Sequence, residues 1–569
     1  MIRNLYENTK DFAFRSAGKR MRTGSGWWSI STLIIALLVS IPVLSVAVNI
    51  FVPAGEIWQH LASTVLPDYV KNSFWLMIGV GTGVFIIGVG TAWLVTMTRF
   101  PGSRFFEWAL LLPLAVPAYL MAYTYTDFLS FTGPLQGFIR SVMGWQAGDY
   151  WFPEIRSLEG AIVMMSFVFY PYVYILSRAA FLEQSHSLLE ASRSLGATAF
   201  ESFYKIAIPL ARPSIAAGMA LALMETLNDF GTVDYFGVQT FTTGIYRTWF
   251  GLGERVAAAQ LAGFLLLFIL VLILVERWSR NKMDFQQGGA SRFRFISQYE
   301  IKDWKKWGSM IACAIPVLAG FFIPLLILVD MFLENMGAAL DARFIQYAFN
   351  TFLVAILSGF IALFISLVMA YSLRLHPTYL TKTAARIGSM GYAIPGSVIA
   401  VGILIPFGWF DNTLDAWLRT TFGISSGLLL SGTIFALVFA YVVRFLAVSF
   451  TTVEASLTKI TPNMDEAAEG LGYRFDQILR KIHIPMMSGS LFAAMMLVIV
   501  DVIKELPATL IVRPFNFDTL AVQVYRLASD ERLAESSGAA LAIILAGLIP
   551  VIILSKSISA SRKIGSSKE

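Results

Sequence analysis

Residues 190–196 read EASRSLG, and residues 466–472, which lie 276 positions later, read EAAEGLG. A second match follows each stretch at the same distance, KIAIP at 205–209 and KIHIP at 481–485. Similarity that returns at one fixed spacing is the mark of an internal repeat. The 569-residue chain is therefore predicted to contain two copies of one structural unit.

The composition places both copies in a lipid bilayer. Hydrophobic residues make up 56% of the chain and charged residues 14%, whereas soluble domains carry about a quarter charged residues. Runs of about 20 apolar residues cross a bilayer as helices, so we predict an all-α polytopic membrane protein with about twelve such helices, six in each copy. The expected spans are 28–51, 73–97, 107–129, 158–177, 214–236, 256–275, 308–332, 349–373, 388–410, 428–450, 488–511 and 537–555.

Polar segments divide the chain and orient it. Residues 278–306 are predicted to link two six-helix halves, 27–277 and 307–569, and residues 1–26 form a polar N-terminal segment. Lys and Arg concentrate in these two polar segments and are sparse in the loops of the opposite parity. Because basic residues favour the cytoplasmic side, we expect the linker and both termini to be cytoplasmic.

The repeated motif falls in a predicted cytoplasmic loop between the fourth and fifth helices of each half. Its spacing predicts two short helices that meet at Gly196 or Gly472, the second of which ends at Pro209 or Pro485. A short amphipathic helix can simply pack on the membrane surface, but two copies in equivalent places favour a shared function. The residues that carry the motif are Glu190, Ala191, Gly196, Ile206 and Pro209 in the first copy and Glu466, Ala467, Gly472, Ile482 and Pro485 in the second.

The two copies resemble the EAA loop of ABC importer permeases, in which this segment forms a coupling helix that docks on a cytoplasmic ATPase. The first copy departs from the pattern only at Ser192, where a second alanine is usual. The stretch METLNDFGTVDYFG at 224–237 and the following TFTTGIYRTW at 240–249 are similar to the fused two-half permeases of ferric iron importers. Related fused permeases move thiamine or phosphonates, which remain alternative substrates.

The resemblance implies a complex and a location. Two copies of an ABC ATPase would bind the cytoplasmic face, and a periplasmic iron-binding protein would deliver ferric iron to this multi-pass protein of the bacterial inner membrane. The chain has no G-x-x-x-x-G-K-[ST] loop, so ATP hydrolysis is expected on the partner and no cofactor on this chain. Nucleic acid is not an expected partner. A secondary carrier of the major-facilitator type also has two parallel six-helix halves, but the paired cytoplasmic motifs are not expected there.

Two acidic residues lie in the predicted fifth helix of each half, four in all. Glu225 and Asp229 in the first half correspond to Asp501 and Glu505 in the second, again at an offset of 276. The spacing of four puts each pair on one helix face, and carboxylates in a membrane are expected to face the bundle interior or a water-filled cavity. They are predicted to line the translocation path and to contact ferric iron transiently, because hard cations prefer oxygen ligands. Alternatively, they pair with Lys504, Arg513 or the backbone and only hold helices together.

Overall fold

The computed structural model describes residues 26–146, 148–183, 194, 196, 198–281, 299–300 and 304–566. These residues are almost entirely helical, and the prediction of an all-α membrane fold is confirmed. The described strands are the two-residue β1 (Thr98–Arg99) and β2 (Tyr299–Glu300), which pair in parallel.

The two halves contain matching series of helices. In the first half the elements are α2 (Gly26–Asn49), α3 (Gly55–Thr64), α4 (Leu66–Met97), α5 (Ser103–Ala109), η1 (Leu112–Ala115), α6 (Ala118–Leu129), α7 (Pro134–Met143), α8 (Leu158–Glu183), α10 (Ala199–Ser202), η2 (Phe203–Ala207), α11 (Ile208–Asn228), α12 (Gly231–Tyr235), α13 (Phe241–Tyr246), η3 (Arg247–Gly251) and α14 (Arg255–Asn281). In the second half they are α15 (Trp304–Val317), η4 (Leu318–Phe322), α16 (Ile323–Glu334), α17 (Met336–Ala339), α18 (Ala342–Leu375), α19 (Tyr379–Gly388), η5 (Gly391–Ala393), α20 (Gly396–Phe422), α21 (Ile434–Leu457), α22 (Pro462–Gly470), α23 (Phe475–Ile478), η6 (Leu479–His483), α24 (Ile484–Lys504), α25 (Pro507–Val512), α26 (Leu520–Ser529) and α27 (Leu533–Ser566).

Eleven of the described helical segments are long and apolar enough to cross a membrane, and a bent pair of helices can supply a twelfth. The bent pair, Ser103–Ala115 with Ala118–Met143, turns by 90° at the place where we predicted a continuous third helix. The break has a local cause, because Pro113 lies inside η1 and Pro117 precedes the first residue of α6. In the second half Pro395 likewise precedes α20, so the predicted third helix there begins later than expected.

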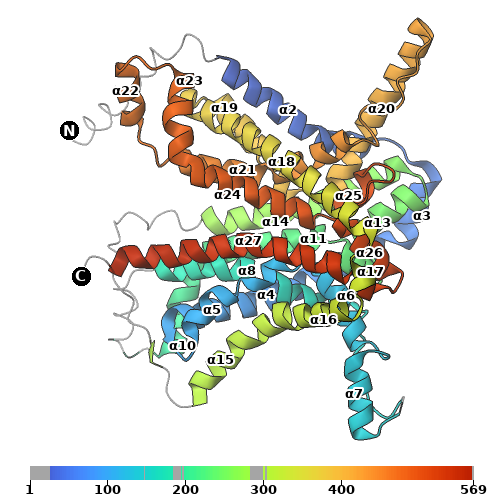
Figure 1. The fold of residues 1–569 in the computed structure, drawn as a ribbon, viewed down its shortest axis with the longest axis vertical. Helices are drawn as coiled ribbons and strands as arrows, with labels where there is room; N and C mark the ends of the chain where they lie inside the picture. Colours follow the sequence, from blue (N-terminus) through green and yellow to red (C-terminus); the bar gives the residue numbers. More distant parts are fainter. Residues whose placement is uncertain are drawn as a thin grey trace.

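The long helices run roughly side by side between two ends of the bundle (Figure 1). The short helices α10, α22 and α23 lie at one end, which we call the motif end, and α3, α13 and α26 lie at the other, which we call the α3 end. Between them, most of the buried apolar side chains form one continuous core that includes residues of both halves.

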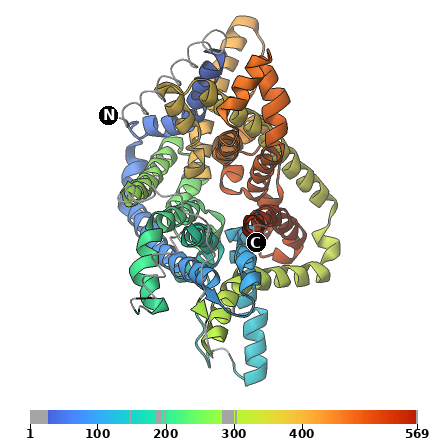
Figure 2. The ribbon, with the colours of Figure 1, turned by 90° about the vertical axis from the view of Figure 1, so that its left-hand side faces the viewer.

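The first membrane helix of each half packs against helices of the other half. Helix α2 contacts α18, α19 and α20, and a Cβ atom on Gly402 of α20 would lie 2.3 Å from the carbonyl oxygen of Pro42. The segment α15–η4–α16 contacts α4, α5, α6 and α8 in return. Figure 2 shows α2 beside the yellow and orange helices of the second half. The boundary at 278–306 stays a prediction, since most of that segment lies outside the described residues, but 27–277 and 307–569 do not pack as two separate bundles.

The predicted fifth helices, 214–236 and 488–511, are each broken near their ends. Helix α11 ends at Asn228 and the short α12 begins at Gly231, while α24 ends at Lys504 and α25 begins at Pro507. Proline has no backbone N–H for the helical hydrogen-bond ladder, which favours the break before α25. Both breaks occur at the same place in the repeat and lie where the two halves meet.

Candidate functional site

A cavity of about 120 Å³ lies between the halves at the two helix breaks. The first half contributes the segment from η1 to the start of α6, part of α8 and the end of α11, and the second half contributes η5, α21 and the end of α24. All four predicted carboxylates line this cavity: Glu225, Asp229, Asp501 and Glu505. The structure thus brings together four groups that are separated by up to 280 positions in the chain.

The carboxylates of Asp229 and Glu505 accept hydrogen bonds from backbone N–H groups of the short helices that follow them. Asp229 accepts hydrogen bonds from the backbone N–H groups of Thr232 at 2.9 Å and Val233 at 3.2 Å. Glu505 accepts one from the N–H of Ala508 at 2.9 Å. Each carboxylate therefore satisfies donors at the beginning of the short helix that follows it, where unpaired N–H groups attract negative charge. Helix α11 ends at Asn228 and α24 ends at Lys504, so Asp229 and Glu505 directly follow their helices, whereas Glu225 and Asp501 lie inside them.

Glu225 and Asp501 differ from the other two carboxylates. Both lie inside their helices, at equivalent positions of the repeat, and both are partly exposed to the cavity. Within the part of the chain that the structure describes, neither makes a hydrogen bond or an ion pair at contact distance, although the ammonium group of Lys504 is near enough to attract both carboxylates. A carboxylate without a partner is costly in an apolar environment, so these two groups are suited to bind a cation that enters the cavity.

Arg444 supplies a positive charge that our sequence analysis missed. Its side chain is 4% exposed, and Nη1 lies 3.4 Å from Oε1 of Glu505 and 2.8 Å from Oδ1 of Asn228. An arginine inside the apolar run 434–457 was the available signal, because ionisable residues within membrane helices usually mark function or a buried partner. Arg513, which we considered as a partner, instead pairs with Asp518.

Equivalent residues of the two halves reach across the interface. Asn228 Oδ1 accepts a hydrogen bond from the backbone N–H of Gly396 at 2.7 Å, at the start of α20. Lys504, which is the counterpart of Asn228 at the offset of 276, donates from Nζ to the carbonyl oxygen of Leu114 at 3.1 Å. These cross-half contacts hold the end of each fifth helix to the broken third helix of the other half.

The cavity contains no preformed metal centre among the described residues, where no three His, Cys, Asp or Glu side chains are grouped to hold an ion. Four carboxylates nevertheless share the cavity with only two cationic side chains, Arg444 and Lys504. The arrangement can attract a cation without trapping it. Ligation of ferric iron by the four carboxylates stays a prediction.

The second coupling motif lies at the motif end. Glu466 and Ala467 are exposed on α22, and Gly472 has a φ of +85° in the turn that follows. Gly196 has nearly the same φ, +84°, in the first half, which shows that both glycines adopt the left-handed conformation that disfavours other residues. Glu190 and Ala191 lie outside the described residues.

We predicted that Pro209 and Pro485 end the second short helix, and this prediction is wrong. In both copies the chain continues through a five-residue π-helical turn, η2 or η6, and the proline is the second residue of the long helix that follows. In the first copy the N–H of Ile208 bonds to the carbonyl of Phe203, five residues earlier. A proline is tolerated in the first turn of a helix, where its missing donor is not needed. Of the motif isoleucines, Ile206 and Ile482 are both half-buried within these turns.

A polar network anchors the second motif to the membrane helices. Asp465 accepts hydrogen bonds from Arg374 Nε at 2.8 Å and lies 2.8 Å from Nε2 of His483. Arg374 also donates to the carbonyl oxygens of Leu457 and Ile460. Burial opposes ionisation of Asp465, but the hydrogen bonds from His483 and Arg374 outweigh it and hold the pKa of this carboxyl below its usual value.

The first motif is anchored by aromatic packing. Phe203 in η2 lies with its ring centroid 5.0 Å from that of Trp93 on α4, and Trp93 also packs edge-on against Phe181 of α8 at 5.6 Å. Phe200, in contrast, is 74% exposed. Of these two phenylalanines, Phe203 is therefore packed against the membrane helices and Phe200 is exposed on the surface.

Comparison with known proteins agrees with this architecture. Residues 85–284, which include the first motif and the end of α11, match the family model of the binding-protein-dependent transport system inner membrane component. Over these residues the chain is similar to the transport permeases of that family. The many membrane-spanning helices, together with this match, indicate a multi-pass protein of the inner membrane.

Relatives of the permease extend the match over both halves. It is 25% identical to the Fe(3+)-transport system permease protein FbpB 2 of Haemophilus influenzae, over 93% of this chain and 98% of that protein. It is 21% identical to the ferric transport system permease protein FbpB of Actinobacillus pleuropneumoniae, over 81% of this chain and 68% of that protein. The sulfate transport system permease protein CysT of Escherichia coli is 25% identical over 36% of this chain and 71% of its own length.

Proposed function

We propose that this permease carries ferric iron across the inner membrane as part of an ATP-driven importer. Two ATPase subunits would bind the coupling segments 190–209 and 466–485, and a periplasmic iron-binding protein would deliver the cargo at the α3 end. In this orientation both termini and the linker are cytoplasmic. The observation that carries the proposal is the pair of unpartnered carboxylates, Glu225 and Asp501, in a cavity between the halves of a permease that is similar along its length to Fe(3+) permeases.

The charge of the cavity supports a cationic cargo. Glu225 and Asp501 offer carboxylate oxygens, which are the ligands that hard cations prefer. Arg444 is engaged by Glu505 and Asn228, and Lys504 by the carbonyl of Leu114. An oxyanion such as the sulfate named for CysT would meet an excess of carboxylates, as would a phosphonate. Thiamine is also a cation, so uptake competition between thiamine and iron separates these two substrates.

The geometry indicates how transport would proceed. In this structure the cross-half contacts of Asn228 and Lys504 close the cavity between the fifth helix of one half and the third helix of the other. Movement of the two coupling segments would separate these contacts and expose Glu225 and Asp501 to one side at a time, as alternating access requires. The π-helical turns η2 and η6 connect each coupling segment directly to its fifth helix.

The test is uptake of radiolabelled iron by vesicles that contain the complete importer, loaded with the iron-bound binding protein. The double variant Glu225→Gln, Asp501→Asn removes both charges without changing side-chain size, and we expect it to lose most iron uptake. Glu159→Gln, at an exposed position near the start of α8, is the matched control and should transport normally. Undiminished uptake in the double variant, with the protein present at its normal level, would contradict the proposed path.

A further inference from the structure

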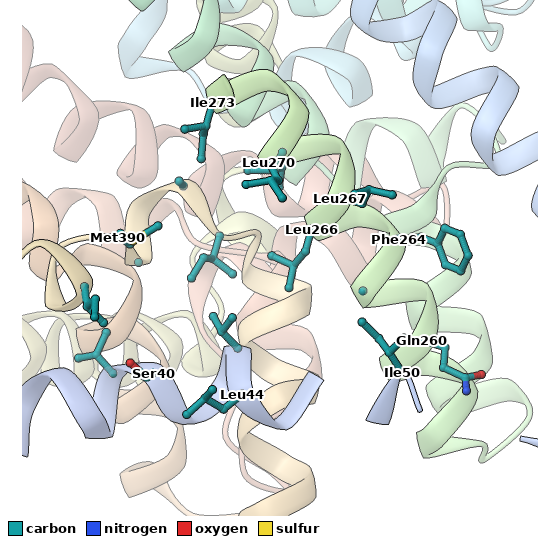
Figure 3. A pocket seen from close by; sticks show the side chains of 18 of the residues that line it. Ser40, Leu44, Ile50, Gln260, Phe264, Leu266, Leu267, Leu270, Ile273 and Met390 are labelled. Atoms are coloured by element: carbon teal, nitrogen blue, oxygen red, sulfur yellow. The ribbon is translucent and has the colours of Figure 1, made fainter. Parts of the chain in front are cut away.

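A second cavity, of about 740 Å³, lies beside α2 and α14 (Figure 3). It shares no lining residue with the cavity that contains the four carboxylates. Its walls come from α2, from α14 and from the α19–η5 segment of the other half. The lining side chains are almost all aliphatic or aromatic, with Leu44, Leu266 and Leu270 among those labelled in Figure 3. Leu44 and Leu270 are about half exposed at its rim. Since α2 and α14 both span the membrane, the cavity is a groove that opens toward lipid.

The groove has a defined length and one polar end. Along α14 it extends from Gln260 to Ile273, which at 1.5 Å per residue is roughly 20 Å. One leaflet of the hydrocarbon core is about 15 Å thick. Trp58 and Gln260 lie toward the α3 end, and Gln260 donates from Nε2 to the carbonyl of Val52 at 2.8 Å. The other amide atom, Oε1 of Gln260, is buried and has no hydrogen-bond partner among the described residues.

The corresponding place in the other half is closed. Helix α27 occupies there the position that α14 occupies in the first half, and the first residues of the two helices differ by 278 positions. At the same offset, Gly547 corresponds to Ile269. A Cβ atom on Gly547 would lie 2.4 Å from the carbonyl oxygen of Ala115, so α27 packs directly on η1. In the first half the larger Ile269 lines the groove instead, and α14 stands away from η5.

We propose that this groove binds one acyl chain of a membrane phospholipid, whose polar end lies at Gln260 and Trp58. An apolar channel of one-leaflet length matches a fatty acyl chain, and an empty groove would leave its walls without contacts. The headgroup would lie beside the amide of Gln260, whose Oε1 is enclosed by protein and would accept from a lipid donor after a rotation of this side chain. Tryptophan commonly lies at the headgroup level, as Trp58 would. The acyl chain would fill the space between α2 and α14, which belong to the same half in sequence. It would thereby support α2, which packs mainly on the other half.

The experiment uses full-length permease in vesicles that contain phosphatidylethanolamine with a photoactivatable diazirine on one acyl chain. We expect labelling to concentrate on residues 39–50 and 260–273. Leu266→Trp fills the groove and should abolish this labelling, whereas Leu274→Trp, at an exposed position of the same helix outside the groove, should leave it unchanged. Val43→Phe, from the α2 side, provides a second filling variant if Leu266→Trp does not reach the membrane.

A second readout separates a bound lipid from the surrounding bilayer. In detergent, addition of phosphatidylethanolamine to delipidated permease should raise the Tm of the natural protein and of Leu274→Trp, but not that of Leu266→Trp. Labelling that is spread evenly over the exposed apolar residues of α14, or an equal rise of Tm in all three proteins, would overturn the proposal. Both readouts are independent of iron transport.

Discussion

The described parts of segments 190–209 and 466–485 share two backbone features but are anchored by different side-chain contacts. Both contain a left-handed glycine, Gly196 or Gly472, and both continue through a π-helical turn into the fifth helix. In the second half Asp465 joins Arg374 and His483 in a buried polar network. In the first half the residue equivalent to His483 is Ala207, and Trp93 packs on Phe203 instead. The two copies therefore share the left-handed glycine and the π-helical turn, while the side chains that hold them in place differ.

The membrane cavity shows the same divergence. Arg444 in the second half corresponds to Val168 in the first, and Lys504 corresponds to Asn228, each at an offset of 276. Both cationic groups of the cavity therefore come from the second half. The unpartnered carboxylates Glu225 and Asp501, in contrast, are present in both halves. The halves share the cavity-lining carboxylates, and they differ in the side chains that join each half to the other.

The largest loss of folding stability is expected from Arg444→Leu, which removes a cationic group that only the second half contributes to the cavity. It leaves Glu505 buried without its partner, and loss of one member of a buried ion pair costs about 3–5 kcal/mol. Adding Glu505→Gln should recover much of this loss. The matched change in the first half, Val168→Ala, removes only apolar contacts and should cost about 2 kcal/mol or less. Chemical unfolding of the purified permease measures all four proteins, and equal losses for Arg444→Leu and Val168→Ala would contradict the assignment.

The next effect tests whether the coupling segments are equivalent. Gly196→Val and Gly472→Val each force a β-branched residue into a left-handed conformation, at a cost of about 1–3 kcal/mol. We expect each variant to abolish uptake while the protein stays in the membrane, because the docking surface can no longer form. The measurement is iron uptake alongside the amount of protein in the membrane fraction. Loss in one variant and normal uptake in the other would show that only one segment transmits the movement.

The smallest effect concerns pH. Since the pKa of Asp465 is held below its usual value in the folded protein, its ionised form stabilises the fold above the unfolded pKa of about 3.9, and this contribution disappears as the pH falls through the folded pKa. Asp465→Asn should therefore cost about 1–2 kcal/mol at neutral pH and nothing further at low pH. Trp93→Phe, which weakens the aromatic anchor of the first half, should give a loss that does not depend on pH. The measurement is Tm as a function of pH. Parallel curves for the natural protein and Asp465→Asn would contradict a pH-dependent contribution of Asp465 to stability.

Much of the site followed from periodicity and repetition. The offset of 276 showed that Glu225 is equivalent to Asp501 and that Asp229 is equivalent to Glu505. The structure places all four residues at one cavity. The distinction between the two pairs was not predictable, because it depends on a helix break one residue before Asp229 and before Glu505. Arg444 could have been found from its position in an apolar run, but its partners Asn228 and Glu505 lie far away in the chain.

The linear order of residues by itself determined that the protein is a duplicated, helical membrane protein with matched motifs, because apolar runs, basic loops and repeat spacing are local properties. Only the tertiary structure decided which half each first helix contacts, which carboxylates remain without partners, and where a lipid-sized groove is left open. These features depend on contacts between helices distant in sequence, and on small differences in side-chain volume such as that between Ile269 and Gly547. No local pattern encodes them.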